Sequence, residues 1–204
     1  MPIRDRAIAW KTVREFIHVQ RMTGFQEAAG VLTSLGAGTP LLVELLAAAQ
    51  ISGMAINAAG NEIFHCWPIP RDFDRTRPFR VRYLFIHNAT DADAPIWKTF
   101  YKGWAPGEVL SAANSTEDEL LTHAAHTVST TANVLEATVW HKSASHQKLS
   151  ATDLMVLFCF ECDNLGSASA NELMLVGVEI EYTRQATAQS REMTDQAIPA
   201  LASF

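Results

Sequence analysis

The segment Trp67-Pro68-Ile69-Pro70-Arg71-Asp72-Phe73-Asp74 leads, three residues later, into Pro78-Phe79-Arg80-Val81-Arg82-Tyr83-Leu84-Phe85-Ile86. In the second segment large apolar residues alternate with arginines at a period of two, which is typical of a half-buried strand. The prolines of the first segment close the loop before that strand. No catalytic or phosphate-binding motif accompanies either segment. We therefore interpret this region as structural and not catalytic.

Composition limits the classes of function. The chain has 204 residues, 48% of them hydrophobic, and a formal net charge of −6. It can bury one sizeable core, and it has no global positive field to attract nucleic acid or anionic lipid. No apolar run approaches the roughly 20 residues of a membrane-spanning helix. Three cysteines at irregular spacings predict free thiols and synthesis in a cytoplasm, and nothing indicates a cofactor or a bound metal.

The ends of the chain differ from its middle. Apolar residues between Asp5 and Met22 recur near helical spacing, so we expect a short amphipathic N-terminal helix. The glycine-rich stretch that follows predicts a connector. This gives an arm over residues 1–38, a body over 39–183 and a flexible tail over 184–204. Leu41 to Leu45 fits either a helical turn or a strand.

The body is predicted to be mainly β. Its strand-like runs are separated by turns and not by regular helices, which favours an antiparallel β-sandwich with jelly-roll-like topology. In the last run, Met174 to Tyr182, the even-numbered residues are expected to face the core while Glu179 and Glu181 face water. The predicted strands are Ile63–Trp67, Phe79–His87, Ile96–Trp104, Asn133–His141, Leu154–Phe160 and Met174–Tyr182.

Candidate chemistry is sparse. Asp72 and Asp74, together with Asp91 or Asp93, offer an oxygen-rich calcium site or a catalytic carboxylate pair, but no calcium-loop spacing is present. Aspartates beside proline and arginine more commonly form turns and ion pairs.

His123 and His126 would share a face of a helix and bind a metal, yet the glutamate of a metalloprotease helix is missing. His141 and His146 have no Ser/His/Asp arrangement around them. We expect no catalytic residue, and the chain is not predicted to be an enzyme.

An aromatic cluster lies in the Ile96 to Trp104 run. Trp97, Tyr101 and Trp104, with Phe100, would form a stacking platform for a sugar if they were exposed, or fill a sandwich core if they were buried. Core packing is the favoured interpretation, because large aromatic side chains dominate burial in β domains.

The order of these motifs resembles structural proteins of tailed bacteriophage virions. The resemblance rests on Trp67–Asp74, Phe79–Tyr83, Ile96–Lys102 and Ser169–Thr183, and it covers roughly Ile63 to Thr183. It implies a non-enzymatic capsid decoration, or cement, protein on the virion surface, assembled in the host cytoplasm. The alternative is a fibre or tail component, or a carbohydrate-binding β-sandwich module. No catalytic residues are implied.

The implied partner is the major capsid protein, and a homotrimer is the favoured assembly, with no nucleic acid and no membrane involved. Terminal segments that order on a neighbour would add contact area without enlarging the folded body. We therefore expect the apolar residues of both ends to make these contacts. They are Trp10, Phe16, Ile17, Ile198, Leu201 and Phe204.

Overall fold

The computed structural model describes residues 11–28, 31–33, 41–46, 51–108, 119–122, 124–142, 149–168 and 172–184. Within them the regular structure is β-strand apart from one short 3-10 helix, η1 (Val19–Arg21). The strands are β1 (Lys11–His18), β2 (Thr23–Ala28), β3 (Val31–Thr33), β4 (Leu41–Leu46), β5 (Ile51–Ile56), β6 (Asn61–Pro68), β7 (Arg80–His87), β8 (Ile96–Trp104), β9 (Glu119–Thr122), β10 (Val134–Ala137), β11 (His141–Lys142), β12 (Met155–Asn164) and β13 (Leu173–Arg184).

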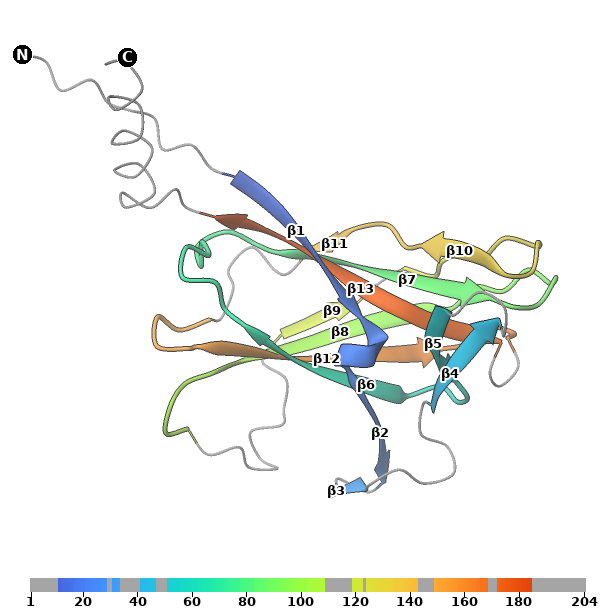
Figure 1. Ribbon diagram of the computed structural model, residues 1–204, viewed down its shortest axis with the longest axis horizontal. Coiled ribbons are helices and arrows are strands. Elements are labelled where there is room, and N and C mark those ends of the chain that lie inside the picture. Colours follow the sequence, from blue (N-terminus) through green and yellow to red (C-terminus); the bar gives the residue numbers. More distant parts are fainter. Residues whose placement is uncertain are drawn as a thin grey trace, which may run out of the picture.

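Two antiparallel sheets face each other as a β-sandwich (Figure 1). Among the described residues, seven strands form one sheet in the order β10-β7-β13-β5-β4, with β1 beside β13 and β11 beside β7. Six strands form the other sheet, in the order β3-β2-β6-β12-β8-β9. From β5 to β8 consecutive strands alternate between the sheets, as in a jelly roll. The expected mainly β sandwich is confirmed.

Aromatic side chains fill the space between the sheets. On β7 the residues of one parity, Val81, Tyr83 and Phe85, are fully buried. Tyr83 stacks on Trp97 of β8, with ring centroids 4.9 Å apart, and Phe158 stacks on Phe160 of β12 at 5.5 Å. Alternation in the sequence therefore predicts correctly which face of β7 is buried.

The expected N-terminal helix is wrong. Residues 11–18 form strand β1, which pairs with β13 in register from Lys11 opposite Arg184 to His18 opposite Gly177. Val13 and Ile17 face the core at strand spacing, and Glu15 accepts a hydrogen bond from Trp67 Nε1 at 2.9 Å. Eight ladder positions on a buried strand outweigh the helical spacing of a few apolar residues. The segment expected to be an arm thus contributes β1 to one sheet and β2 to the other.

Two other expectations are settled by the strands. Leu41–Leu46, which fits either a helix or a strand by sequence, is strand β4 and pairs with β5.

The three cysteines are free, with Cys159 and Cys162 buried and Cys66 exposed. Burial raises the pKa of the Cys162 thiol to about 12. In the part of the chain that the structure describes, no helix is long and apolar enough to cross a membrane. Residues 185–204, the rest of the expected tail, lie outside the described residues.

A bulge in β13 corrects the expected inner face of that strand. Leu175 lies opposite Phe85 and Gly177 lies opposite Leu84, so Val176 is an extra residue. Before the bulge the core-facing residues are Leu173 and Leu175, and after it they are Val178, Ile180 and Tyr182. One extra residue exchanges the two faces of a strand. Met174 and Val176 therefore do not share the buried face with Val178, whereas Glu179 does lie on the outer face.

Candidate functional site

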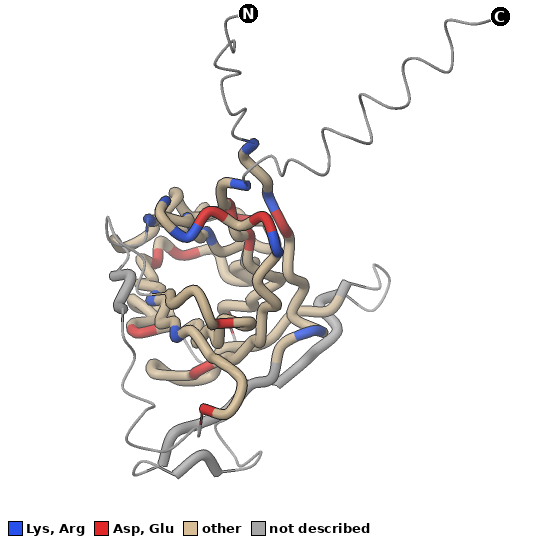
Figure 2. The backbone as a smooth tube through the Cα atoms, turned by 90° about the vertical axis from the view of Figure 1, so that its left-hand side faces the viewer, with Lys and Arg blue, Asp and Glu red and all other residues tan. Residues whose placement is uncertain are grey.

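The outer face of the seven-stranded sheet carries a ladder of charged residues. Arg80 and Arg82 extend from the outer side of β7, Glu179 and Glu181 from the outer side of β13, and Arg14 from β1. In the strand register Arg82 lies opposite Glu179, and Arg80 and Arg14 flank Glu181 from either side. Basic and acidic positions accordingly lie next to one another on this sheet in Figure 2. We call these five residues the arginine–glutamate ladder.

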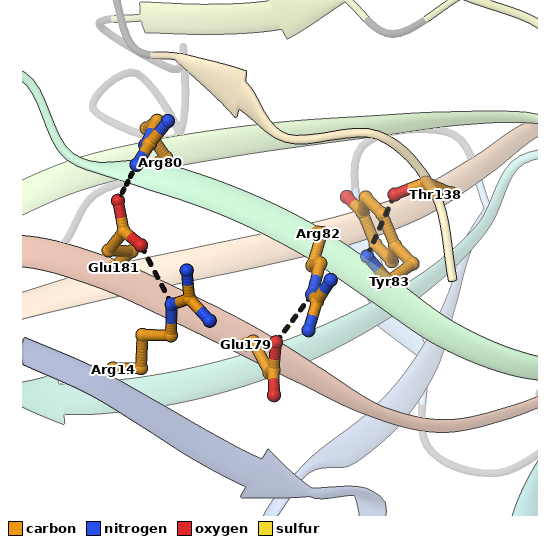
Figure 3. Close-up of polar contacts among 7 residues, drawn as sticks. All are labelled: Arg14, Arg80, Arg82, Tyr83, Thr138, Glu179 and Glu181. Atoms are coloured by element: carbon orange, nitrogen blue, oxygen red, sulfur yellow. Dashed lines mark hydrogen bonds and ion pairs between the residues drawn. The ribbon is translucent and has the colours of Figure 1, made fainter.

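The ladder is joined by ion pairs (Figure 3). Arg14 Nε lies 2.8 Å from Glu181 Oε2, and Arg80 binds the other oxygen of the same carboxylate. Arg82 Nε lies 2.5 Å from Glu179 Oε2. The Glu181 side chain is 5% exposed, so its charge is buried between two guanidinium groups. Each of these ion pairs uses one nitrogen of its arginine, and a guanidinium carries five N–H donors. The ladder therefore keeps donors for a ligand.

An extra residue beside β7 brings Trp140 over this ladder. Thr138 is held opposite Tyr83 by two hydrogen bonds, each 3.0 Å long. Thr138 N donates to Tyr83 O, and Tyr83 N donates to Thr138 Oγ1, the second of which is drawn in Figure 3. His141 pairs with Val81, and Thr138 lies opposite Tyr83. Val139 and Trp140 therefore lie together opposite Arg82, the one residue between Val81 and Tyr83. Such a bulge redirects side chains. Without it, Trp140 would share the inner face with Thr138.

Trp140 contacts all three arginines of the ladder. Its ring lies 4.6 Å from the guanidinium carbon of Arg82, 5.4 Å from that of Arg14 and 5.6 Å from that of Arg80. These are cation–π distances, each worth about 0.5–1 kcal/mol at an exposed site. The side chain is only half-buried. Trp140 is thus a rigid, partly exposed aromatic surface on the solvent side of the sheet.

A hollow of about 260 Å³ adjoins the ladder and shares Arg80 and Glu181 with it. Burial raises the pKa of Tyr182, one of the lining residues. The hollow is slightly smaller than the roughly 300–1,000 Å³ of typical small-molecule sites, so it suits one small polar group. Its lining residues are Thr12, Arg77, Pro78, Arg80, Lys142, Glu181, Tyr182 and Thr183.

The aspartates singled out from the sequence do not converge. Asp72 pairs with Arg184, with Oδ2 and Nε 2.6 Å apart, and this hydrogen bond raises the pKa of Arg184. Asp74 accepts hydrogen bonds from Thr76 N and Oγ1, at 2.9 and 2.6 Å, and lies 3.2 Å from Arg77 Nε. These two residues are turn-forming and ion-paired, as the favoured interpretation predicts.

Asp91 and Asp93 lie beyond the other end of β7. Eight strand residues span roughly 26 Å, so a joint site with Asp72 and Asp74 is not formed.

The aromatic cluster of β8 is divided. Trp97 and Tyr101 are each 1% exposed and pack in the core, so they offer no platform to a sugar. Trp104 is half-buried and donates from Nε1 to Glu108 O at 3.1 Å. The core interpretation therefore holds for Trp97 and Tyr101. The exposed aromatic surface is Trp140 instead, which sequence reasoning placed in an alternating strand because nothing in the local residues marks the bulge.

The expected partner-binding residues fall into three situations. Phe16 lies on the outer face of β1 and is 45% exposed, whereas its neighbour Ile17 is fully buried within this chain. They cannot share a face because adjacent strand residues point in opposite directions. Trp10 lies outside the described residues. So do Ile198, Leu201 and Phe204.

The structure describes two of the four histidines that the sequence offers as candidate ligands, His126 and His141. His126 Nε2 lies 3.3 Å from Glu136 Oε2, while His123 and His146 lie outside the described residues. Burial lowers the pKa of His141. Potential metal ligands gather elsewhere, around His87 at the end of β7.

Comparisons with known proteins were made on the sequence and on the fold. No protein family matches the sequence, and no curated protein matches it. Among solved structures, a xylanase 10B fragment of Clostridium thermocellum, with CBM22-1 and GH10 modules and bound xylohexaose, is similar at a TM-score of 0.44 and 14% identity. The similarity covers 84% of this chain and 27% of that one, so this chain spans about a quarter of the xylanase fragment.

Two smaller structures are also similar. A family 35 carbohydrate-binding module from Clostridium thermocellum has a TM-score of 0.41 and 7% identity, covering 82% of this chain and 97% of that one. The CBM2 module of the evolved Dit of Lactobacillus casei BL23 phage J-1 has a TM-score of 0.37 and 7% identity, covering 88% and 100%. Likenesses at this level assign no function to the chain.

Proposed function

We propose that this chain is a non-enzymatic glycan-binding β-sandwich, and that Trp140 and the arginine–glutamate ladder bind the sugar. The observation that carries the proposal is the half-buried Trp140 ring, supported by three guanidinium groups on the solvent side of the sheet. Aromatic faces pack against the apolar faces of sugar rings, and neighbouring arginines donate to hydroxyl and carboxylate oxygens. The ladder supplies both kinds of contact within one surface.

The charge of the surface favours an acidic sugar. The ladder has three arginines against two glutamates, although the whole chain carries −6. Lys142, exposed at the rim of the adjoining hollow, adds a further cation. Arginine is suited to bidentate recognition of a carboxylate. A uronic-acid polymer therefore fits this surface better than its neutral counterpart.

Hydrolysis of the bound glycan is not part of the proposal. Glycoside hydrolysis by the common route needs one carboxylic acid that donates a proton to the leaving oxygen. Glu179 and Glu181 both accept hydrogen bonds from arginines. Neither is arranged as a proton donor, so the surface suits binding and not cleavage.

Tryptophan fluorescence during titration with an oligouronate tests this proposal. Trp140→Ala should weaken binding about tenfold or more, since tenfold corresponds to about 1.4 kcal/mol. Trp104→Ala is the matched control, because Trp104 is also half-buried but lies on the other sheet. Trp140→Phe should recover part of the affinity. Equal affinities for Trp140→Ala and the native chain, with both folded by circular dichroism, would rule out this surface.

A second candidate follows from Phe16. Its ring is 45% exposed on β1, and the resemblance to tailed-phage virion proteins supports contact with a capsid or with another protomer there. A deletion of residues 1–37 would not test this contact by itself, because it would remove β1 and β2 from the sandwich. Phe16→Ser in the full chain tests the contact and keeps both strands. In this candidate it lowers binding to capsids that lack the protein, and unchanged binding excludes Phe16 as the contact.

The virion setting fits either candidate. A glycan-binding sandwich in a fibre or tail component would attach a phage to its host, whereas a decoration protein would stabilise a capsid without a small ligand. Capsids mixed with the protein should resist heat better only in the second case. The trimer expected from the sequence belongs to that second proposal.

A further inference from the structure

Four potential metal ligands gather beyond the end of β7, far from the hollow at its beginning. One ligand atom from each of His87, Asp91, Asp93 and Glu172 lies within 4.8 Å of the others. His87 ends β7, the two aspartates lie in the following loop, and Glu172 immediately precedes β13. The cluster therefore joins two parts of the chain that are distant in sequence, residues 87–93 and Glu172.

The centre of the cluster is buried. His87 and Asp93 are each 1% exposed, and His87 Nε2 lies 2.9 Å from Asp93 Oδ2 without the alignment of a hydrogen bond. Neither oxygen of the Asp93 carboxylate receives a hydrogen bond from any residue that the structure describes. A buried carboxylate without donors is costly unless a cation compensates it. Asp93 Oδ2 lies beside the imidazole, whereas Asp93 Oδ1 and His87 Nδ1 are buried without a hydrogen bond from any residue that the structure describes. These buried polar atoms point to a ligand and not merely to an acidic surface.

Backbone hydrogen bonds anchor the main chain at three of the four residues. Asn88 N donates to Glu172 O at 3.0 Å, and Val128 N donates to Asp93 O at 3.1 Å. Asn133 N donates to His87 O at 2.8 Å. The imidazole of His87 lies on the same buried face of β7 as Phe85, which lies two residues before it in the strand. These bonds position the main chain of His87, Asp93 and Glu172 before any ion binds, which reduces the cost of ordering the site.

We propose that His87, Asp91, Asp93 and Glu172 form a structural site for a divalent transition-metal ion, with Zn²⁺ preferred over Mn²⁺ and Ca²⁺. One imidazole with three carboxylates is a ligand set that Zn²⁺ accepts, and imidazole disfavours Ca²⁺, which takes oxygen ligands. Three carboxylates lie close together in this cluster, so a divalent ion also relieves their mutual repulsion. Asp91, whose side chain is 60% exposed, leaves the site open to solvent.

An ion pair between His87 and Asp93 is the competing explanation, because Nε2 and Oδ2 lie 2.9 Å apart. Such a pair would offset one of the three negative charges. In that case the ion pair compensates the buried carboxylate by itself, and added metal would not raise the stability of the fold. Metal binding therefore separates the two explanations, and it does so independently of glycan binding.

Calorimetry and thermal unfolding of the full chain, stripped with a chelator, provide the test. Zn²⁺ should bind saturably at one ion per chain and raise Tm with increasing concentration, more than Mn²⁺ and much more than Ca²⁺. Co²⁺ in its place should give a visible absorption spectrum of a nitrogen- and oxygen-liganded ion. No saturable binding, or a preference for Ca²⁺ over Zn²⁺, would overturn the proposal.

Variants show whether the cluster holds the ion. Asp91→Asn should weaken Zn²⁺ binding by at least about tenfold, because even changes outside the ligands cost roughly 10–100-fold. Because Asp91 is exposed and its substitution removes one of three neighbouring negative charges, the metal-free Tm should not fall. Glu136→Gln is the matched control, since Glu136 also contacts a histidine but lies outside the cluster. His87→Gln should abolish binding if it folds, and Asp91→Asn decides the matter if it does not. Equal Zn²⁺ affinity of Asp91→Asn and the native chain would contradict this assignment.

Discussion

The two faces of strand β7 are built from the same eight residues but differ in their chemistry. On the inner face Val81, Tyr83 and Phe85 are fully buried, whereas on the outer face the side chains of Arg80 and Arg82 are 36% and 27% exposed. Burial of apolar area stabilises a fold strongly, while exposed ion pairs are typically worth about 0–1 kcal/mol. The inner face therefore holds the sandwich together, and the outer face is available for binding.

The inner face should produce the largest effect on stability. Phe85→Ala removes a fully buried ring that packs against Trp97, with centroids 5.5 Å apart. We expect it to lower the free energy of unfolding by about 3–5 kcal/mol, as is usual for such truncations. Urea unfolding measures this change. Leu135→Ala, at a 56% exposed position on β10, is the control and should stay within about 0.5 kcal/mol. Similar losses in both variants would contradict the assignment of the core.

The outer face also contains one tightly packed point, at Gly177. A Cβ atom there would lie 2.4 Å from Phe16 Cε2 and 2.6 Å from Ile17 O. Gly177→Ala should therefore cost about 1–3 kcal/mol in unfolding free energy, because β1 must move away from β13.

Phe16→Ala combined with Gly177→Ala separates the two contacts. The double variant should recover only part of the loss, since the ring is gone but the carbonyl of Ile17 remains. Phe16→Ala alone is the control. Full retention of stability by Gly177→Ala would mean that β1 does not pack on β13 as a strand.

The sequence predicts the buried face of a strand correctly where alternation is unbroken. Tyr83 and Trp97 are predicted on buried faces and lie there. The prediction is wrong at the bulges, because one extra residue reverses the faces and leaves no mark in the local pattern. Val176 was therefore expected on the wrong face of β13, and Trp140 was not recognised as part of a site. Val176 lies within a strand that the sequence predicts correctly, whereas Trp140 lies between β10 and β11, where the sequence predicts one continuous strand.

The long-range contacts were also beyond the sequence. The ladder needs β1 beside β13 and β7 beside β13, and His87 meets Glu172 only through the same pairing. Strand order depends on how loops close and which faces complement each other, not on local propensity. Asp91 and Asp93 were noted as candidate ligands, but with Asp72 and Asp74 as their partners. The structure joins them to a histidine that ends a core strand.

A buried histidine on β6, in the other sheet, should make the stability of the fold depend on pH. His65 of β6 points inward between Ile63 and Trp67, and Arg21 O lies 3.0 Å from its Nδ1. Burial lowers the pKa of His65 below 6.5, so the folded state binds its proton less readily than the unfolded state. The free energy of unfolding should therefore be independent of His65 above pH 6.5 and should fall as the pH drops below that value. Unfolding curves over this range measure the loss.

His65→Asn is the variant for that experiment. It should flatten the fall in stability without removing it, because burial lowers the pKa of His141 in the same direction. His126→Asn is the control, because His126 is only half-buried. An unchanged pH profile in His65→Asn would show that this imidazole does not resist protonation.

The smallest effect is expected from an isolated ion pair of the ladder. Glu179→Gln removes the partner of Arg82, both partly exposed, and should cost no more than about 1 kcal/mol, less at high salt. Glu181→Gln should cost more, because that carboxylate is 5% exposed and serves both Arg14 and Arg80. Urea unfolding at low and high salt compares them. If Glu179→Gln were as damaging as Phe85→Ala, the outer face would carry the fold, and a binding surface there could not vary independently of stability.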